Sequence, residues 1–563
     1  MTSTAQGFGG PRRYNLRGGF TVLRFISLLF IFLLGLTSCA PVPSLWGEYS
    51  TPTPEFPILA EVTASGRPLL STATPPPDPT STFTSTPTLA PQETPTSPAL
   101  ASTSAEEPVL ESVRVEGSLT PTFDVPSVLY YAQSGDTISG IASRFGIERS
   151  EVHAETPLPD SGLVPPGTLL IMPDRISEPT TPESQLFPDS ELVFSGTAVD
   201  FDIQSYIKSA DGQLSTHREY LGSTGWNTGA DEIRRLAFEN SINPRLLLAL
   251  LEYESRWVRA DAVDAVHRDY PMGYINLYYK GLFGQMLWAV NQLSTGYYGW
   301  RTGTLTQLQF PDGTRLRLNP RLNAATAAIQ YLFSKLHNQS QWAQMIDPGN
   351  GFLAVYTEMF GDPWARADTV DQVFPSGLAQ PTLVLPFEPD TKWSYTGGPH
   401  GAWEHDGSLA AVDFAPFTDH GGCDSTPTWV TAAAPGTIVR SERGVVIQDL
   451  DGDGFEQTGW ALVYLHIASA GRVAAGTYVQ QDDRIGHASC EGGQATGTHL
   501  HFARKYNGEW VAADGPLPLV LDGWVVKQGN LPYEGYLIKE GKTVTADPVG
   551  QLKSVIIRTL DDE

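Results

Sequence analysis

The sequence predicts a multidomain protein with a small βααβ module, an all-α middle domain and a mainly antiparallel β domain near the C-terminus. Its 563 residues exceed what one compact domain usually holds. Helical periodicity dominates residues 200–375, whereas residues 380–550 contain short apolar runs separated by Gly and Pro. A shorter stretch at 128–174 combines strand-like and helix-like patterns. We therefore expect three different folds in one chain.

The charge balance excludes one class of partner. Lys and Arg number 36 against 62 Asp and Glu, which leaves a formal charge of -26. A chain this acidic is repelled by phosphate backbones, so nucleic acid is not expected as a partner. Three cysteines in 563 residues are also too few for a disulfide-framed scaffold. The odd count sets Cys39 apart from Cys423 and Cys490.

The N-terminus has the polarity of an export signal. Four arginines precede an apolar run over 25–36, which is too short to span a membrane comfortably. The run ends in Leu36-Thr37-Ser38-Cys39, which resembles the bacterial lipoprotein signal. This resemblance implies a signal peptide over 1–39 and a lipid anchor on Cys39 that holds the protein to a membrane in the cell envelope. An uncleaved membrane anchor is the alternative.

Both alternatives place the remaining chain outside the cytoplasm. Because that compartment is oxidising, Cys423 and Cys490 can form a disulfide. Residues 40–126 are dominated by Thr, Pro, Ser and Ala, with too few large apolar side chains to offset the entropy of ordering. We expect this segment to be a disordered, semi-extended linker that holds the folded domains away from the membrane.

Residues 128–174 read as strand, helix, loop and strand. Asp136 is expected to cap a helix whose apolar side chains share one face, namely Ile138, Ile141, Ala142 and Phe145. The run GDTISGIASRFG over 135–146 carries the hallmark of the LysM family, which this module resembles. The resemblance implies binding of N-acetylglucosamine-containing glycan, chiefly peptidoglycan. A packing module without sugar binding is the alternative.

The middle domain places a carboxylate on an apolar helix face. Residues 231–240 form one amphipathic segment, and Asn243-Pro244 is a cap and first-turn pair that opens a second helix over 245–257. In that helix Glu254 continues an apolar stripe at helical spacing. Desolvation on such a face favours the protonated carboxyl group, as a glycosidic general acid requires.

The string INPRLLLALLEYES resembles the catalytic helix of the soluble lytic transglycosylase and goose-type lysozyme group, whose acid is the Glu of a Glu-Ser pair. The resemblance implies a lysozyme-like domain over 200–375 with Glu254 as its general acid. The family's Gly-Leu-Met-Gln-like segment has only Met272-Gly273-Tyr274-Ile275-Asn276 as a counterpart, which lacks the Gln. A domain that grips glycan without cleaving it is the alternative.

Histidines concentrate in the last third of the chain. Of 11 in total, those between positions 400 and 501 are His400, His405, His420, His466, His487, His499 and His501. Short apolar runs in the same window predict a compact β domain. In His499-Leu500-His501 the two imidazoles lie two apart, so on a strand they point to one face and can enter one site. A catalytic zinc takes three protein ligands, so one imidazole can ligate while the other handles protons.

Four motifs follow one another in this region, namely TGGPH at 396–400, AAVDFAP at 410–416, YLHI at 464–467 and CEGGQATGTHLHF at 490–502. In this order they resemble peptidase family M23, particularly its staphylolysin (LasA-like) branch of zinc endopeptidases. The resemblance implies an M23 domain over 380–550. It also implies Zn²⁺ ligands and catalytic histidines, which are His400, Asp413 and His501 for the metal and His466 and His499 for catalysis. His405 lies close enough to Asp413 to be a rival first ligand.

One loop in this domain copies the start of a calcium site. Asp449, Asp451 and Asp453 are spaced as its first ligands, but Trp460 stands where the bidentate Glu belongs. An ordinary Asp-Gly hairpin turn is the alternative to Ca²⁺ here.

The predicted parts share one target, the bacterial cell wall. We therefore predict a peptidoglycan hydrolase, a zinc metalloendopeptidase that cleaves peptide crosslinks and is held to glycan through its LysM module. Two alternatives stay open. In one, glycan cleavage through Glu254 is the main activity; in the other, the protein is a non-catalytic activator that binds the cell wall.

Overall fold

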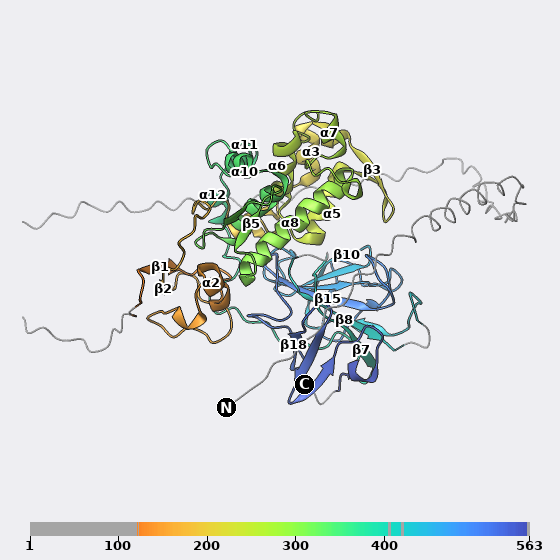
Figure 1. The fold of residues 1–563 in the computed structure, drawn as a ribbon. Coiled ribbons are helices and arrows are strands. Elements are labelled where there is room, and N and C mark those ends of the chain that lie inside the picture. The colour runs from red at the N-terminus through yellow and green to blue at the C-terminus, as the bar shows by residue number, and fades with distance from the viewer. Residues whose placement is uncertain (1–120, 122, 404–406, 418–420, 560–563) are drawn as a thin grey trace, which may run out of the picture. The chain divides into compact units, whose positions relative to one another are not determined.

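The computed structural model describes residues 121, 123–403, 407–417 and 421–559. A small module, a helical region and a large antiparallel sheet follow one another along this part of the chain (Figure 1). The predicted signal peptide with Cys39 and most of the predicted linker lie outside the described residues, which include only positions 121 and 123–126 of that linker. Among the residues that are described, no helix has the length and apolar character needed to cross a membrane.

The first module pairs two strands around one helix. Strand β1 (Ser127–Tyr131) runs antiparallel to β2 (Leu169–Pro173). Helix α2 (Ile138–Phe145) and the 3₁₀ turn η1 (Arg149–Glu151) lie between them in the sequence. The four apolar side chains of the predicted α2 stripe are all buried. The second helix of the expected βααβ pattern is only the single 3₁₀ turn η1.

The predicted cap of α2 is wrong by one residue. Thr137 is the N-cap, and its side chain accepts a hydrogen bond from the backbone N–H of Gly140 at 3.0 Å. Asp136 is buried instead, where it accepts a 2.6 Å hydrogen bond from the Tyr130 hydroxyl and pairs with Arg144. A buried carboxylate needs such partners, so Asp136 ties β1 to α2 rather than capping the helix.

Helices dominate the middle region and enclose one apolar core, whose buried members begin at Leu186, before the predicted boundary at 200. The helices are α3 (Ile203–Ala210), α4 (Gln213–Thr216), α5 (Gly229–Asn240), α6 (Pro244–Ser255), α7 (Ala265–Asp269), α8 (Leu282–Thr302), α9 (Ala324–Leu336), α10 (Gln339–Met345), α11 (Phe352–Phe360) and α12 (Pro363–Ala367). The 3₁₀ turns η2 (Asp189–Glu191), η3 (Gly196–Ala198) and η4 (Leu277–Tyr279) complete the region.

The two predicted helices are present as α5 and α6. Asn243 caps α6 by accepting the N–H of Arg245, with Pro244 in the first turn, as expected. The region is not all-α, however, because it contains two short hairpins, which are β3 (Arg218–Leu221) with β4 (Gly225–Thr228) and β5 (Gln307–Gln309) with β6 (Arg315–Arg317). Strands of three or four residues carry too little alternation to be recognised in the sequence.

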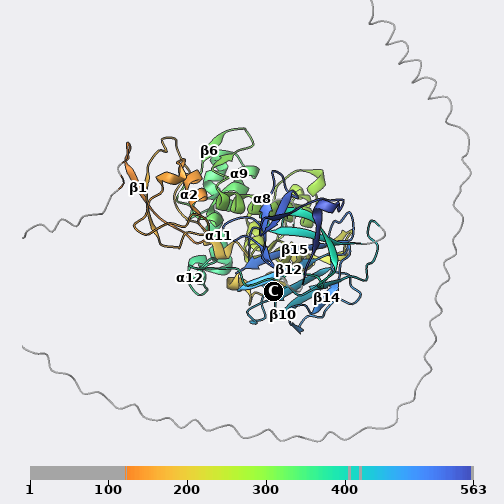
Figure 2. The same cartoon turned by 90° about the horizontal axis from the view of Figure 1, so that it is seen from below.

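The C-terminal region is built on a nine-stranded antiparallel sheet with the order β13-β10-β11-β12-β15-β8-β7-β21, in which β16 pairs with β15. Figure 2 shows the central strands β12 and β15 next to each other. The strands of this sheet are β7 (Lys392–His400), β8 (Ala411–Pro416), β10 (Gly436–Glu442), β11 (Val445–Asp449), β12 (Trp460–Leu465), β13 (Tyr478–Val479), β15 (Leu500–Tyr506), β16 (Glu509–Trp510) and β21 (Val555–Ile557).

Two smaller sheets accompany the large one. The first pairs β14 (Arg484–His487) with β9 (Trp429–Thr431). The second contains β17 (Val520–Leu521), β18 (Trp524–Gln528), β19 (Gly535–Lys539) and β20 (Lys542–Thr545). A last 3₁₀ turn, η5 (Leu552–Ser554), leads into β21, which pairs with β7 beyond the predicted domain end at 550.

A buried ion pair joins the helical core to the large sheet. The carboxylate of Glu509 on β16 accepts hydrogen bonds from Arg301 on α8 at 2.9 Å and from the hydroxyl of Tyr297 at 2.6 Å. Arg301 also pairs with Asp189 at 3.0 Å. The side chains of Arg301 and Glu509 are only 10% and 3% exposed. One guanidinium therefore compensates two carboxylates that would otherwise be buried without a cation.

We predict that Arg301→Met destabilises the full chain by about 3 to 5 kcal/mol, because it leaves those carboxylates without a counter-ion. Chemical denaturation followed by tryptophan fluorescence measures the change. Arg234→Met is the matched control, since Arg234 pairs with Glu442 at 3.2 Å with 46% and 37% of the two side chains exposed. An exposed pair should contribute less than about 1 kcal/mol. Equal losses in the two variants would contradict the prediction.

Candidate active site and metal centre

Three adjacent strands bring His400, Asp413 and His501 to one point. His501 on β15 lies opposite Asp413 on β8, and β8 pairs with β7, which ends at His400. The register of β7 shifts between Gly397 and His400, and such a bulge re-aims the side chain that follows it. Nε2 of His400 lies 3.0 Å from Nδ1 of His501, and both lie 3.3 Å from Oδ1 of Asp413. All three residues are buried.

The backbone determines which nitrogen of each ring faces this cluster. Nδ1 of His400 donates to the carbonyl of Gly398 at 2.8 Å, and Nε2 of His501 donates to the carbonyl of Ala402 at 2.9 Å. A carbonyl oxygen only accepts, so these nitrogens carry protons and the opposite nitrogens present lone pairs to the cluster when the rings are neutral. Oδ1 of Asp413 is buried there without a hydrogen bond. The three atoms form a donor set for a divalent cation.

A tetrahedral zinc ion fits this donor set. Zinc bonds to nitrogen and oxygen of about 2.1 Å imply a separation between ligand atoms of about 3.4 Å. The separations of 3.0 Å and 3.3 Å in the cluster are close to that value. The outer nitrogens are held by carbonyl groups, which is the usual second layer of partners around histidine ligands.

The pKa values of the three cluster residues are shifted in different directions. Burial alone would lower the pKa of His400, but the Asp413 carboxylate raises that pKa above its ordinary value. Burial lowers the pKa of His501, and the neighbouring His400 adds to this effect. Burial alone would raise the pKa of Asp413, yet His400 and His501 hold that pKa well below its usual range. The carboxylate is therefore ionised and can act as a negative ligand.

Two further histidines border the cluster. The ring of His466 lies 4.4 Å from that of His499, measured between centroids. Nδ1 of His466 donates to the carbonyl of Glu491, and Nδ1 of His499 donates to the carbonyl of Gly497, both at 2.8 Å. Nε2 of His499 lies 3.7 Å from Oδ1 of Asp413. In both rings, Nε2 is therefore the nitrogen that remains available for proton transfer.

His466 is neutral and conformationally strained. Burial, with added effects of His499 and His501, lowers its pKa to about 3, so its imidazole carries no charge near pH 7. Its φ of 66° lies in the left-handed region, which non-glycine residues rarely adopt. Backbone strain of this kind clusters at functional sites, where the surrounding structure maintains it.

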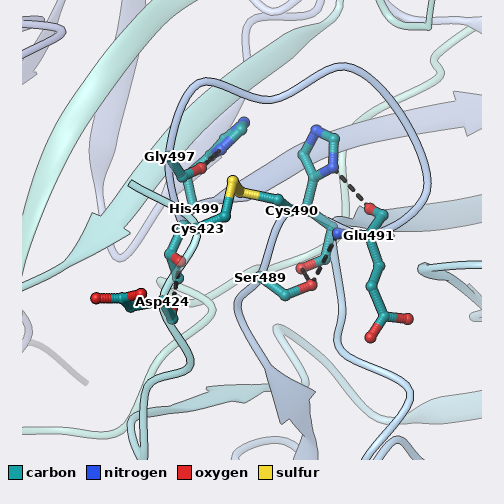
Figure 3. Close-up of a disulfide and its surroundings, with 9 residues drawn as sticks. Cys423, Asp424, Ser489, Cys490, Glu491, Gly497 and His499 are labelled. Carbon is teal, nitrogen blue, oxygen red and sulfur yellow. Dashed lines mark hydrogen bonds between the residues drawn. A yellow bond between two sulfur atoms is a disulfide. The ribbon is translucent and has the colours of Figure 1, made fainter. Parts of the chain in front are cut away.

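A disulfide holds the two loops beside these histidines. Cys423 is bonded to Cys490, and Figure 3 shows this bond between the loop of Gly497 and His499 and the backbone of Glu491. The loops are joined a second time by Thr498, whose hydroxyl donates to the carbonyl of Asp424 at 2.6 Å. A cavity of about 440 Å³ is lined by residues that include both cysteines and Glu491.

Comparisons with known proteins match both halves of the described structure. The family model for peptidase family M23 matches residues 419–513, which contain His466, His499 and His501. The family model for the LasA N-terminal domain matches residues 185–373, the helical region. The chain carries an M23 metallopeptidase domain. M23 metallopeptidases depend on zinc, which agrees with the His-Asp-His cluster of this structure.

The individual relatives have low sequence identity to this chain, but the matched region covers most of the length of each relative. Protease LasA of Pseudomonas aeruginosa (strain UCBPP-PA14) is 28% identical over 349 residues, which is 58% of this chain and 75% of that protein. Beta-lytic metalloendopeptidase of Lysobacter enzymogenes is 24% identical over 174 residues, 30% of this chain and 92% of that protein. Among solved structures, the deep-sea M23 metalloprotease pseudoalterin is 26% identical and covers 30% of this chain and 96% of its own, with a TM-score of 0.25.

Two features of the candidate site were not predicted from the sequence. Tyr533 stacks on the His400 ring, with centroids 4.1 Å apart and planes inclined by 18°. Its backbone N–H donates to the carbonyl of Pro399, and its own carbonyl accepts from Gly398. Position 397 requires glycine, because a Cβ atom added there would lie 2.5 Å from Oδ2 of Asp413. The two glycines of TGGPH are a sequence signal for the close approach of this backbone to Asp413, but nothing in the sequence pointed to Tyr533.

The remaining predicted sites lie apart from this cluster or outside the described residues. Glu254 is on α6 in the helical region, with its side chain 6% exposed and Oε1 3.5 Å from Nε2 of His337. Oε1 of Glu254 is buried without a hydrogen bond. His405 and Cys39 are not among the described residues, so their predicted roles stay predictions.

The proposed calcium loop is satisfied by its own backbone. Asp449 accepts the N–H groups of Asp451 at 3.0 Å and Gly454 at 2.9 Å. Asp453 accepts the N–H of Phe455 at 2.9 Å. Carboxylates that bond to nearby backbone amides in this way stabilise an ordinary turn. Calcium at this loop therefore has no support.

We predict that replacing both Cys423 and Cys490 by Ser destabilises the chain by about 4 kcal/mol, because the bridge closes a loop across a sequence separation of 67 residues. Peptidase activity should fall further than zinc content, since the bridged loops position His466 and His499 rather than the His-Asp-His cluster. Thermal unfolding, metal analysis and peptide hydrolysis measure the three effects. Ser425→Ala in the same loop is the control. An unfolding midpoint equal to that of the control would refute the prediction.

Proposed function

We propose that this protein is a peptidoglycan hydrolase whose M23 domain cleaves peptide crosslinks of the bacterial cell wall. The observation that carries the proposal is the convergence of four imidazoles on one buried carboxylate. His400 and His501 face Asp413 with the nitrogens that carry lone pairs in the neutral rings. His466 and His499 lie beside them, with Nδ1 of each ring bonded to a backbone carbonyl. Such a division suits three metal ligands and two groups that handle protons.

His400, Asp413 and His501 would hold the metal. A bound zinc ion supplies Lewis-acid polarisation of a peptide carbonyl and lowers the pKa of water. The two imidazoles would bind it as neutral donors, and the carboxylate would contribute one negative charge. The carbonyl groups of Gly398 and Ala402 accept hydrogen bonds from the ring nitrogens that face away from the cluster. Both rings are therefore already oriented for metal binding.

His466 and His499 would move the protons of the reaction. Nδ1 of each ring is committed to a backbone carbonyl, so Nε2 is the atom that exchanges a proton. A neutral His466 can accept a proton from the attacking water at Nε2. The resulting imidazolium can then stabilise the developing oxyanion or pass the proton to the leaving amine.

The N-terminal parts would deliver this activity to the wall. The module over 127–173 carries the LysM hallmark and the strand, helix and strand order expected for it, so we assign it peptidoglycan binding. Cys39 would carry the lipid anchor and place the protein in the cell envelope, which agrees with a disulfide between Cys423 and Cys490. Labelling with a fatty-acid probe tests the anchor; a Cys39→Ala variant that labels like the wild type would refute it.

The assigned ligands and catalysts should respond differently to substitution. His400→Ala, Asp413→Ala and His501→Ala should each lose zinc, because a three-ligand site has no spare donor. His466→Ala and His499→Ala should keep zinc but lose activity by factors of about 10² to 10⁴, the usual contribution of an acid-base group. Metal analysis and hydrolysis of an oligoglycine peptide separate the two classes.

His487→Ala serves as the control, because Nδ1 of His487 bonds to the Thr428 carbonyl and this ring is not part of the cluster. It should retain both zinc and activity. If His400→Ala keeps stoichiometric zinc while His405→Ala loses it, His405 is the first ligand and our assignment is wrong.

Mass spectrometry of digested sacculi tests the function as a whole. Cleaved peptide crosslinks support the proposal, and an intact wall would instead indicate a non-catalytic binding protein. Anhydro-sugar or reducing sugar ends would support the second candidate, glycan cleavage by Glu254. The observation that favours this candidate is that Oε1 of Glu254 is buried without a hydrogen bond among the described residues, with His337 as its nearest ion-pair partner. Sugar products should then vanish in Glu254→Gln while peptide cleavage persists.

A further inference from the structure

A second group of side chains that could hold a metal ion lies in the helical region, apart from the M23 domain. Atoms of His217, Glu219 and Glu232 that can each bind a metal all lie within 4.8 Å of one another. His217 directly follows α4, Glu219 belongs to β3 and Glu232 lies in the first turns of α5. The loop, hairpin and helix thus converge on one point through their side chains.

Among the residues that the structure describes, Glu232 has no hydrogen-bond partner that explains its burial. Its exposed fraction is 0%, and neither of its carboxylate oxygens makes a hydrogen bond. Nε2 of His217 is also buried without a hydrogen bond. A buried, unsatisfied carboxyl group costs free energy unless something in the folded protein compensates it.

We propose that His217, Glu219 and Glu232 bind a zinc ion that is separate from the catalytic metal and braces the helical region. The separation of Nε2 of His217 from Oε2 of Glu219 is 3.5 Å, close to the value of about 3.4 Å between ligands of tetrahedral zinc. Two carboxylates and a neutral imidazole neutralise a divalent cation, which removes the electrostatic cost of burying Glu232.

The donor types favour zinc over the harder cations. Calcium takes six to eight oxygen ligands, and magnesium keeps several waters in octahedral geometry. Zinc accepts both imidazole nitrogen and carboxylate oxygen, and a zinc site with three protein ligands leaves a fourth position for water. The cluster offers three donors, of which one is nitrogen, so calcium and magnesium are poorly matched.

Glu219 is already positioned by the structure around it. Its Oε2 accepts the N–H groups of Leu282 at 2.8 Å and Phe283 at 3.4 Å, at the start of α8. Ligating carboxylates are normally hydrogen-bonded by such a second layer. The ring of His217 lies against Trp257, with centroids 5.1 Å apart. A zinc ion here would link α5 and the β3–β4 hairpin to the start of α8, the helix that carries Arg301.

Zinc analysis of the full chain tests the proposal. The wild type should bind two zinc ions per chain and Asp413→Ala one. Adding Glu232→Gln to Asp413→Ala should remove the remaining zinc, and Glu232→Gln alone should bind one. Glu358→Gln is the matched control, because its carboxylate pairs with Arg259 instead, and it should bind two. Circular dichroism confirms that each variant is folded.

Cobalt substitution gives a readout that does not depend on activity. Asp413→Ala loaded with Co²⁺ should show visible absorption of a tetrahedral nitrogen and oxygen site, and His217→Ala should abolish it. The proposal is overturned if Asp413→Ala binds no zinc, or if its zinc persists when His217→Ala or Glu232→Gln is added. A wild type with one zinc that is lost in Glu232→Gln but kept in Asp413→Ala would support this site and refute the catalytic one.

Discussion

The His-Asp-His cluster of the candidate active site depends on the register of a single strand. His501 lies in β15 between Leu465 of β12 and Asp413 of β8. A slip of one residue would turn its imidazole to the opposite face of the sheet, because side chains alternate along a strand. Leu500 and Phe502 on either side are fully buried, so the same slip would remove both from the core. Hydrophobic packing of the sheet therefore determines which donor atoms meet.

Backbone carbonyl groups then orient the rings that the strands bring together. Each of the four histidines donates one ring nitrogen to a carbonyl, and these belong to Gly398, Ala402, Glu491 and Gly497. A bulge in β7 positions the first, and a disulfide borders the last two. Because the partners are backbone atoms of constrained segments, the orientation of each ring is fixed by the fold itself. This is preorganisation built from main-chain geometry.

The sequence predicted the members of the cluster better than the way they are held. Metal and proton chemistry restrict residue type, so His-Leu-His on a strand and an Asp in an apolar run are visible as motifs. Carbonyl oxygens have no residue identity, and Tyr533 comes from a distant turn, so neither could be anticipated. Asp136 shows the same limit, because its tertiary partners Tyr130 and Arg144 outcompete the local cap that the pattern suggested. The short hairpins of the helical region were not predicted, because their strands are too short to show a clear alternation of apolar and polar residues.

The helical region completes the edge of the sheet that carries the site. Strand β16, which pairs with the end of β15, contacts it through Trp510, whose N–H donates to the Tyr298 hydroxyl at 3.1 Å and whose indole donates to the Asn240 carbonyl at 3.3 Å. The hydroxyl of Ser241 donates to the carbonyl of Gly508 at 2.6 Å. An excised M23 domain would lose these bonds and leave Glu509 without Arg301. The strand that bears His501 is therefore stabilised partly from outside its own domain, and the helical region and the peptidase domain belong to one compact unit.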